Sequence, residues 1–153
     1  MIKSQFVAAI AVSTTLAAAQ AQPPADLAAR LAVARIDGTL AIWCEGQFEM
    51  RRPRGYAIAV RSASAGGRYL VVDDAATITE LAAFKGAPDL ACYTPDEARK
   101  LNQSIRSSET IRGRIAPLFP TTIVCGFVEN TDAVCWQYSP KTRSFVKVGE
   151  WQT

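Results

Sequence analysis

Short runs of alternating hydrophobic and polar residues cover most of the chain from residue 39 onward. A period of two is typical of a β-strand that buries one face. Eight segments show this alternation or a short apolar run: residues 39–44, 56–60, 69–72, 77–81, 90–93, 121–128, 133–138 and 145–148. Turn-forming residues separate them, so we expect about six to eight short strands that pair mostly as antiparallel β-hairpins.

One segment, residues 95–107, has the spacing of a helix instead. Thr94 is the expected N-cap, Pro95 takes the first helical position, and Glu97 completes a capping box with Thr94. Spacings of three and four residues create one apolar stripe: Ala98, Leu101 and Ile105. The sequence therefore predicts one well-capped helix in a chain that is otherwise rich in strands.

Residues 25–34 fit two patterns. Leu27 and Leu31 stand four apart, which favours a helix, whereas alternation near the end of the segment favours a strand. Asp37 and Gly38 follow, and Asp-Gly between two apolar runs is typical of a type I′ hairpin turn. That turn predicts a strand before it, paired with the strand after it.

These elements predict a single α+β domain over residues 22–153, because no stretch is long enough to separate two domains. Residues 1–21 read as a signal peptide, with Lys3, an apolar stretch, and Ala19 and Ala21 before a cut. The stretch is shorter and richer in alanine than a membrane anchor, which needs roughly 20 strongly apolar residues. We therefore expect no membrane span, and a protein that is periplasmic or secreted after cleavage near Ala21.

The four cysteines are expected to form two disulfides, since an exported protein folds in an oxidising compartment. Cys125 and Cys135 flank one predicted hairpin, and a three-residue loop would place them directly opposite each other. A loop of two or four residues would put them on opposite faces. The pairing Cys44–Cys92 then follows by exclusion, with both residues in apolar strand segments. The sequence contains no C-x-x-C knuckle of the kind that indicates a zinc site.

The composition excludes several classes of function. The chain has no histidine, which excludes His-ligated metals and haem and every Ser-His or Cys-His catalytic arrangement. The net charge of +3 is too small to indicate nucleic acid as a partner. No glycine-rich phosphate loop is present, so we expect no nucleotide cofactor, and no metal or other cofactor is indicated.

Arginines cluster in residues 48–72, where Glu49 is the one acidic residue. The cluster comprises Arg51, Arg52, Arg54, Arg61 and Arg68. Tyr56 lies between these arginines in the sequence, and Tyr69 directly follows Arg68. Guanidinium groups bind carboxylates and phosphates and stack on aromatic rings, so the segment is a candidate binding surface for an anionic partner. The alternative is an ordinary solvated face.

The sequence thus predicts an exported domain that binds an unknown protein or an anionic envelope component and is not an enzyme. One alternative is a small hydrolase that uses carboxylates, with Asp73 and Asp74 or Glu129 and Asp132 as candidates. These residues lie in predicted turns, where aspartate is common for conformational reasons. Another alternative is a structural subunit whose sheet edges pair with copies of itself.

Overall fold

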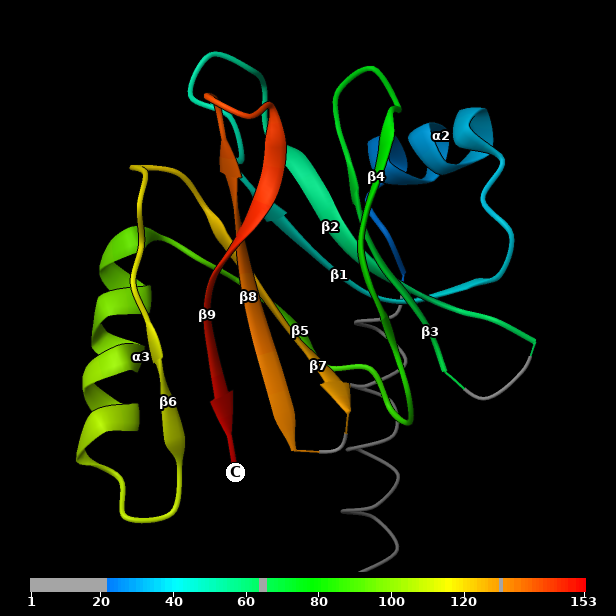
Figure 1. Cartoon of the computed structure of the whole chain (residues 1–153). Helices are drawn as coiled ribbons and strands as arrows, with labels where there is room; N and C mark the ends of the chain where they lie inside the picture. Colours follow the sequence, from blue (N-terminus) through cyan, green and yellow to red (C-terminus); the bar gives the residue numbers. More distant parts are fainter. Residues whose placement is uncertain (1–21, 64–65, 130) are drawn as a thin grey trace, which may run out of the picture.

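The computed structural model describes residues 22–63, 66–129 and 131–153 and arranges them in four layers, helix, sheet, sheet and helix (Figure 1). Helix α2 (Ala25–Ala34) covers the outer face of a sheet that we call the N-terminal sheet. Its strands lie in chain order and are antiparallel: β1 (Thr39–Gly46), β2 (Gly55–Arg61), β3 (Gly67–Val72) and β4 (Ile78–Phe84). The predicted signal peptide lies outside the described residues.

The C-terminal sheet has five antiparallel strands in the spatial order β5-β7-β8-β9-β6, and helix α3 (Pro95–Ser107) covers its outer face. The strands are β5 (Leu90–Tyr93), β6 (Arg112–Ile115), β7 (Ile123–Glu129), β8 (Asp132–Ser139) and β9 (Ser144–Gln152). The predicted single α+β domain is confirmed. The described residues contain nine strands and two helices, against the six to eight strands and one helix that we expected.

Alternation along the strands sends neighbouring side chains into different cores. In β2, Tyr56, Ile58 and Val60 pack towards α2, whereas Ala57 and Ala59 pack towards the C-terminal sheet. A third core lies between α3 and the C-terminal sheet. Both faces of β2 are therefore buried, which a strand achieves only between two layers.

Helix α3 begins as the sequence predicts. The Thr94 hydroxyl accepts the backbone N–H of Glu97, and the Glu97 carboxylate accepts the backbone N–H of Thr94. Its stripe buries Ala98 and Ile105 against the sheet. The helix lies beside β6, and the side-chain oxygen of Asn102 accepts a hydrogen bond from the backbone N–H of Ile115 at 2.8 Å.

The hairpin predicted at Asp37 and Gly38 is wrong. The preceding segment is helix α2, with Leu27 fully buried, and the two turn residues join this helix to β1. The helical spacing of Leu27 and Leu31 was the decisive pattern, because it lays both leucines on the N-terminal sheet. Arg35 ends the helix with a left-handed backbone, at φ 51°.

Both predicted disulfides are present. Cys44–Cys92 joins β1 to β5, each at an edge of its sheet, and so ties the two sheets together. Cys125–Cys135 joins directly opposed residues of β7 and β8, with their Cα atoms 4.1 Å apart. No cysteine of the described residues is free.

The register of the second disulfide has a different origin from the one we expected. Glu129 is paired with Asp132, so two residues, not three, separate the strands. A two-residue loop alone would have shifted the cysteines out of alignment. A bulge between Phe127 and Glu129 supplies the missing residue and returns Cys125 to a position opposite Cys135.

Candidate binding site

Several connections gather at one end of the two sheets, which we call the loop end (Figure 1). They are the β1–β2 loop (residues 47–54), the β3–β4 turn (residues 73–77) and the β8–β9 turn (residues 140–143). The segment between β6 and β7, residues 116–122, crosses the same end, and we call it the strap. Loops carried by a rigid framework are common places for binding sites.

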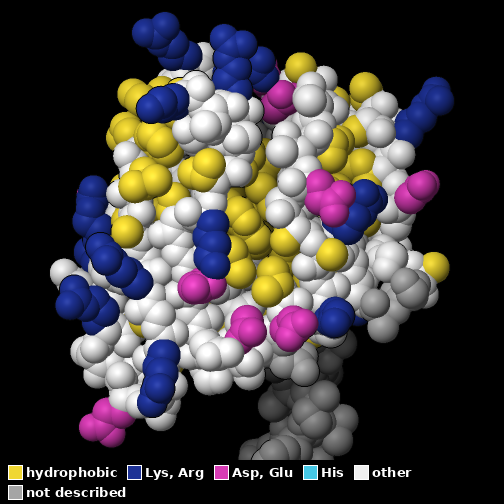
Figure 2. Space-filling model, in the orientation of Figure 1, with side chains coloured by type: hydrophobic (Ala, Val, Ile, Leu, Met, Phe, Trp, Pro, Cys, Tyr) yellow, Lys and Arg dark blue, Asp and Glu magenta, His cyan; other side chains and the backbone are white. Residues whose placement is uncertain are grey.

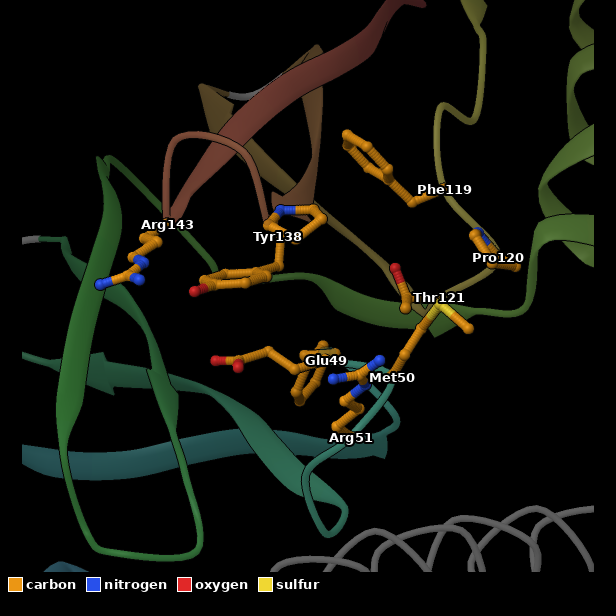
Figure 3. Close-up of a pocket in the computed structure, with 10 residues that line it drawn as sticks. Glu49, Met50, Arg51, Phe119, Pro120, Thr121, Tyr138 and Arg143 are labelled. Atoms are coloured by element: carbon orange, nitrogen blue, oxygen red, sulfur yellow. The ribbon is translucent and has the colours of Figure 1, made fainter.

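A pocket of about 420 Å³ lies between the β1–β2 loop, the strap and the β8–β9 turn. Most of its lining is apolar: Phe48, Met50, Phe119, Pro120, Tyr138 and Pro140. The polar and charged members are Glu49, Arg51, Thr121 and Arg143. In Figure 3, Tyr138 lies opposite Glu49 of the β1–β2 loop, and Phe119 projects from the strap. Pockets of this size and character suit small ligands or single side chains.

Aromatic contacts through Phe145 link Phe48 and Tyr138, two of the residues that line the pocket. Phe48 is 4% exposed and meets Phe145 of β9 edge to face, with ring centroids 6.2 Å apart. Phe145 meets Tyr138 of β8 in the same manner at 5.6 Å. These three rings form a continuous apolar base that joins the β1–β2 loop to the C-terminal sheet.

Hydrogen bonds lock the β1–β2 loop to the strap. The backbone N–H of Gln47 donates to the Thr122 hydroxyl, and the backbone N–H of Thr122 donates to the Gln47 carbonyl, both at 2.8 Å. The Gln47 side chain closes its own loop by donating to the carbonyls of Glu49 and Arg52. Gly46 permits this approach, because a Cβ there would lie 2.5 Å from the Thr122 side chain.

Gln137 of β8 holds the strap from below. Its side chain is fully buried and its carbonyl oxygen accepts the backbone N–H groups of Leu118 and Phe119 at 2.9 and 3.2 Å. Its amide nitrogen donates to the carbonyls of Phe119 and Thr121 at 2.6 and 2.9 Å. One buried amide therefore fixes three residues of the strap, and the pocket wall that they form is ordered before any ligand arrives.

Two positive charges of the pocket have no ion-pair partner among the described residues: Arg51 and Arg143. Arg51 comes from the β1–β2 loop and Arg143 from the β8–β9 turn, so they stand on different walls (Figure 3). Glu49 is the one acidic residue among the described residues of the lining, and its carboxylate lies 3.6 Å from the guanidinium of Arg52. The site is therefore apolar inside and positive at its rim.

The backbone of Arg143 is left-handed, with φ 53°. Glycine or asparagine usually takes such a position, because a longer L side chain is strained there by about 1 kcal/mol. The β8–β9 turn thus places an arginine where local conformation favours glycine. Strain of this kind is common where a side chain has a role beyond folding.

The structure distributes the arginines of the sequence-predicted surface. Arg51 lines the pocket, but Arg61 lies at the far end of β2. The other three are paired with acidic side chains: Arg52 with Asp73 at 2.9 Å, Arg54 with Glu45 at 2.9 Å, and Arg68 with Glu80 at 3.5 Å. The five side chains do not form one unpaired cluster, and Arg51 alone joins the candidate site.

The two tyrosines of that predicted surface are buried in different cores. Tyr69 is fully buried between the sheets, and its hydroxyl donates to the Phe127 carbonyl at 2.7 Å. Burial raises the pKa of Tyr69. The ring packs directly on Gly126, where a Cβ would lie 2.8 Å from it. Tyr69 therefore joins β3 to β7, and both tyrosines are buried.

Tyr56 fastens helix α2 to the N-terminal sheet. Its hydroxyl donates to the Asp26 carboxylate, whose oxygens lie 2.8 and 2.9 Å away, and the Arg30 guanidinium stands 5.1 Å from the ring centroid. Desolvation, with the hydrogen bond to Asp26, raises the pKa of Tyr56 to about 12. The same bond lowers the pKa of Asp26.

We expect the stabilisation by Tyr56 relative to Tyr56→Phe to depend on pH. It is present between the ordinary pKa values of the two groups, 3.8 for Asp26 and 10.0 for Tyr56. It is lost as pH falls through the lowered pKa of Asp26, and again as pH rises towards 12 and Tyr56 ionises. Urea unfolding of both proteins across pH measures the difference. Tyr138→Phe is the control without this bond, and a difference independent of pH would contradict the expectation.

The acidic residues suggested for catalysis have structural partners. One oxygen of Asp73 accepts the backbone N–H groups of Ala75 and Thr77, and the other accepts from Arg52. Glu129 lies 3.7 Å from Lys85, and Asp132 accepts from the Gln152 side chain. Within the described ranges, no group of three or more Asp, Glu, Cys or His residues is placed to hold a metal ion.

Sequence reasoning missed most of the pocket lining, including Met50, Phe119, Tyr138 and Arg143, and it missed the buried Gln137 that holds the strap. Gln137 did carry a signal, because it stands two residues from Cys135 in a predicted strand and so shares a face with a cysteine that was expected to form a disulfide. A polar residue at such a position needs partners, and these partners are the strap. The other residues meet only through contacts between distant loops.

Comparison of the chain with protein-family models, curated proteins and solved structures found no match. In the part of the chain that the structure describes, neither helix is long and apolar enough to cross a membrane.

Proposed function

We propose that this protein is a binding domain and that the pocket at the loop end is its recognition site. The observation that carries the proposal is a preformed apolar pocket with two guanidinium groups at its rim, Arg51 and Arg143, that pair with no acidic side chain of the described residues. Walls from both sheets are joined by Gln47, Thr122 and Gln137. A site ordered in advance loses little conformational entropy on binding.

Binding is favoured over catalysis by the chemistry of the lining. Hydrolysis by carboxylates requires two of them, one as an acid and one as a base or nucleophile. Of the described residues that line the pocket, Glu49 alone is acidic, and Arg52 lies beside it. The hydroxyls of Thr121 and Tyr138 have no histidine to activate them, and Glu49, the one carboxylate among the described lining residues, lies 3.6 Å from the guanidinium of Arg52.

Self-assembly through sheet edges is disfavoured by two devices. The outward N–H of Ile115 in β6 is occupied by Asn102, and β4 contains a bulge opposite Tyr69 and Leu70. Covered and bulged edges are the usual protection against strand pairing between molecules. These features favour binding through the loops over assembly through the sheet edges.

We propose further that the domain works outside the cytoplasm. Two disulfides that include a link between the sheets suit an oxidising compartment. The leader predicted from the sequence, with cleavage after Ala21, fits the same location. The intact mass of the exported protein tests this: residues 22–153 are expected, and a mass that retains residues 1–21 would contradict it.

The binding proposal is tested by titrating ¹⁵N-labelled residues 22–153 with phenylacetate, phenylacetamide and phenethylamine. We expect at least one aromatic probe to bind, with a dissociation constant of about 1 mM, typical of fragments in a preformed pocket. The amides of Met50, Arg51, Phe119 and Arg143 should shift, and those of α2 should not. If none of the three probes shifts the pocket amides, the recognition site lies elsewhere.

A further inference from the structure

We infer that the ligand of this pocket is an acidic segment of a partner protein, in which an apolar side chain enters the pocket and a neighbouring carboxylate pairs with Arg51 or Arg143. This inference rests on the proposed binding function. It commits the site to one class of macromolecule.

The apolar lining indicates what occupies the interior. Six of the ten lining residues are aromatic, aliphatic or proline: Phe48, Met50, Phe119, Pro120, Tyr138 and Pro140. A polysaccharide or phosphate-rich ligand would need many hydrogen-bond donors and acceptors inside the pocket, whereas this interior offers few. An aromatic or large aliphatic side chain matches the lining and is the usual anchor of a protein interface.

The charges indicate what accompanies that side chain. Arg51 and Arg143 stand on two walls without ion-pair partners among the described residues, whereas the carboxylate of Glu49 lies 3.6 Å from Arg52, which also pairs with Asp73 and Asp74. Lys141 adds another positive charge to the same turn as Arg143. Figure 2 shows Lys and Arg side chains gathered with apolar side chains at this end of the molecule. A guanidinium group prefers the paired oxygens of a carboxylate.

The surface around the pocket indicates a polypeptide rather than a small molecule. Three large hydrophobic residues are prominently exposed in the described part of the chain, and two belong to the loop end: Met50 at 71% and Leu118 at 63%. Met50 stands on the β1–β2 loop and Leu118 on the strap, next to Phe119. Exposed apolar residues rimmed by charge are typical of protein-binding surfaces. The contact area therefore extends beyond the pocket.

The experiment is a selection of random 12-residue peptides on residues 22–153, followed by calorimetric titration of synthetic peptides. We expect the selected peptides to share an aromatic or large aliphatic residue with Asp or Glu within a few positions. Replacing that acid by its amide should weaken binding about tenfold, the effect of losing one charge-assisted hydrogen bond.

Two matched double variants assign the effect to the pocket. Arg51→Ala with Arg143→Gly removes both rim charges and should weaken the same peptides tenfold or more, at roughly 1.4 kcal/mol for each tenfold change. Arg61→Ala with Arg35→Gly removes the same charge away from the pocket, and Arg35 has the same left-handed backbone as Arg143. This control should change affinity less than about twofold.

The outcomes separate the inference from the proposed function. Neutral selected peptides, or peptides that bind the pocket variant as tightly as the wild type, overturn the acidic partner. So does a selection without enrichment. Binding of vesicles containing anionic phospholipid, lost in the pocket variant, would overturn it in favour of an envelope component. In each case, shifts of the pocket amides with phenylacetamide would still support a binding site at the loop end.

Discussion

Replacing Cys44 and Cys92 by serine is expected to lower the free energy of unfolding by about 4 kcal/mol, against about 3 kcal/mol for the pair Cys125 and Cys135. The first disulfide closes a sequence separation of 48 residues and the second a separation of 10. A longer closed loop removes more entropy from the unfolded chain.

The positions of the two disulfides in the fold strengthen this ordering. Cys44–Cys92 joins two sheets whose facing edges, β1 and β5, share no strand ladder. Cys125–Cys135 joins β7 and β8, which the backbone ladder already holds together. Urea unfolding of the two double variants under identical conditions measures both losses. Equal losses, or a larger loss for Cys125→Ser with Cys135→Ser, would contradict the role of the first disulfide as the link between the sheets.

Gln137→Leu is expected to have the second large effect, a loss of about 3 kcal/mol together with loss of ligand binding. Leucine has a similar volume but cannot hydrogen-bond, so the variant leaves the N–H groups of Leu118 and Phe119 and the carbonyls of Phe119 and Thr121 without their partner. Each buried group left unsatisfied costs about 1–3 kcal/mol unless the strap opens to water. Opening would limit the loss of stability but would destroy one wall of the pocket.

A matched control separates the role of Gln137 from the chemistry of the substitution. Gln152 also lies in the C-terminal sheet, but it is exposed and its side chain makes one hydrogen bond, to Asp132. Gln152→Leu should change stability by less than about 1 kcal/mol. Hydrogen exchange of the Leu118 and Phe119 amides gives the local measurement. Unchanged protection of these amides in Gln137→Leu would show that the strap does not depend on this side chain.

Local patterns were sufficient for most elements of the fold. The alternation in residues 56–60 predicted which side chains of β2 share a face, and the capping box at Thr94 located the start of α3. These features depend on neighbouring residues alone. The hairpin prediction at Asp37 failed because it relied on the turn residues alone. The leucines before the turn belong to helix α2, which packs onto the N-terminal sheet.

Long-range features lay beyond the sequence pattern. The clustering of arginines in residues 48–72 gave no indication that Arg52 and Arg68 pair with Asp73 and Glu80 across the structure. The burial of Tyr69 between sheets likewise required the packing of two layers. The pocket combines Met50 with Arg143, which are 93 residues apart, and only the pairing of the two sheets brings them together.

The most direct test of the central claim, a preformed binding pocket at the loop end, is a crystal structure of residues 22–153 soaked with phenylacetate. We expect the ring between Phe48, Phe119 and Tyr138, the carboxylate within hydrogen-bond distance of Arg51 or Arg143, and the strap in the position that Gln137 gives it in the free protein. A pocket closed by the strap, or a probe bound only elsewhere on the surface, would contradict the account.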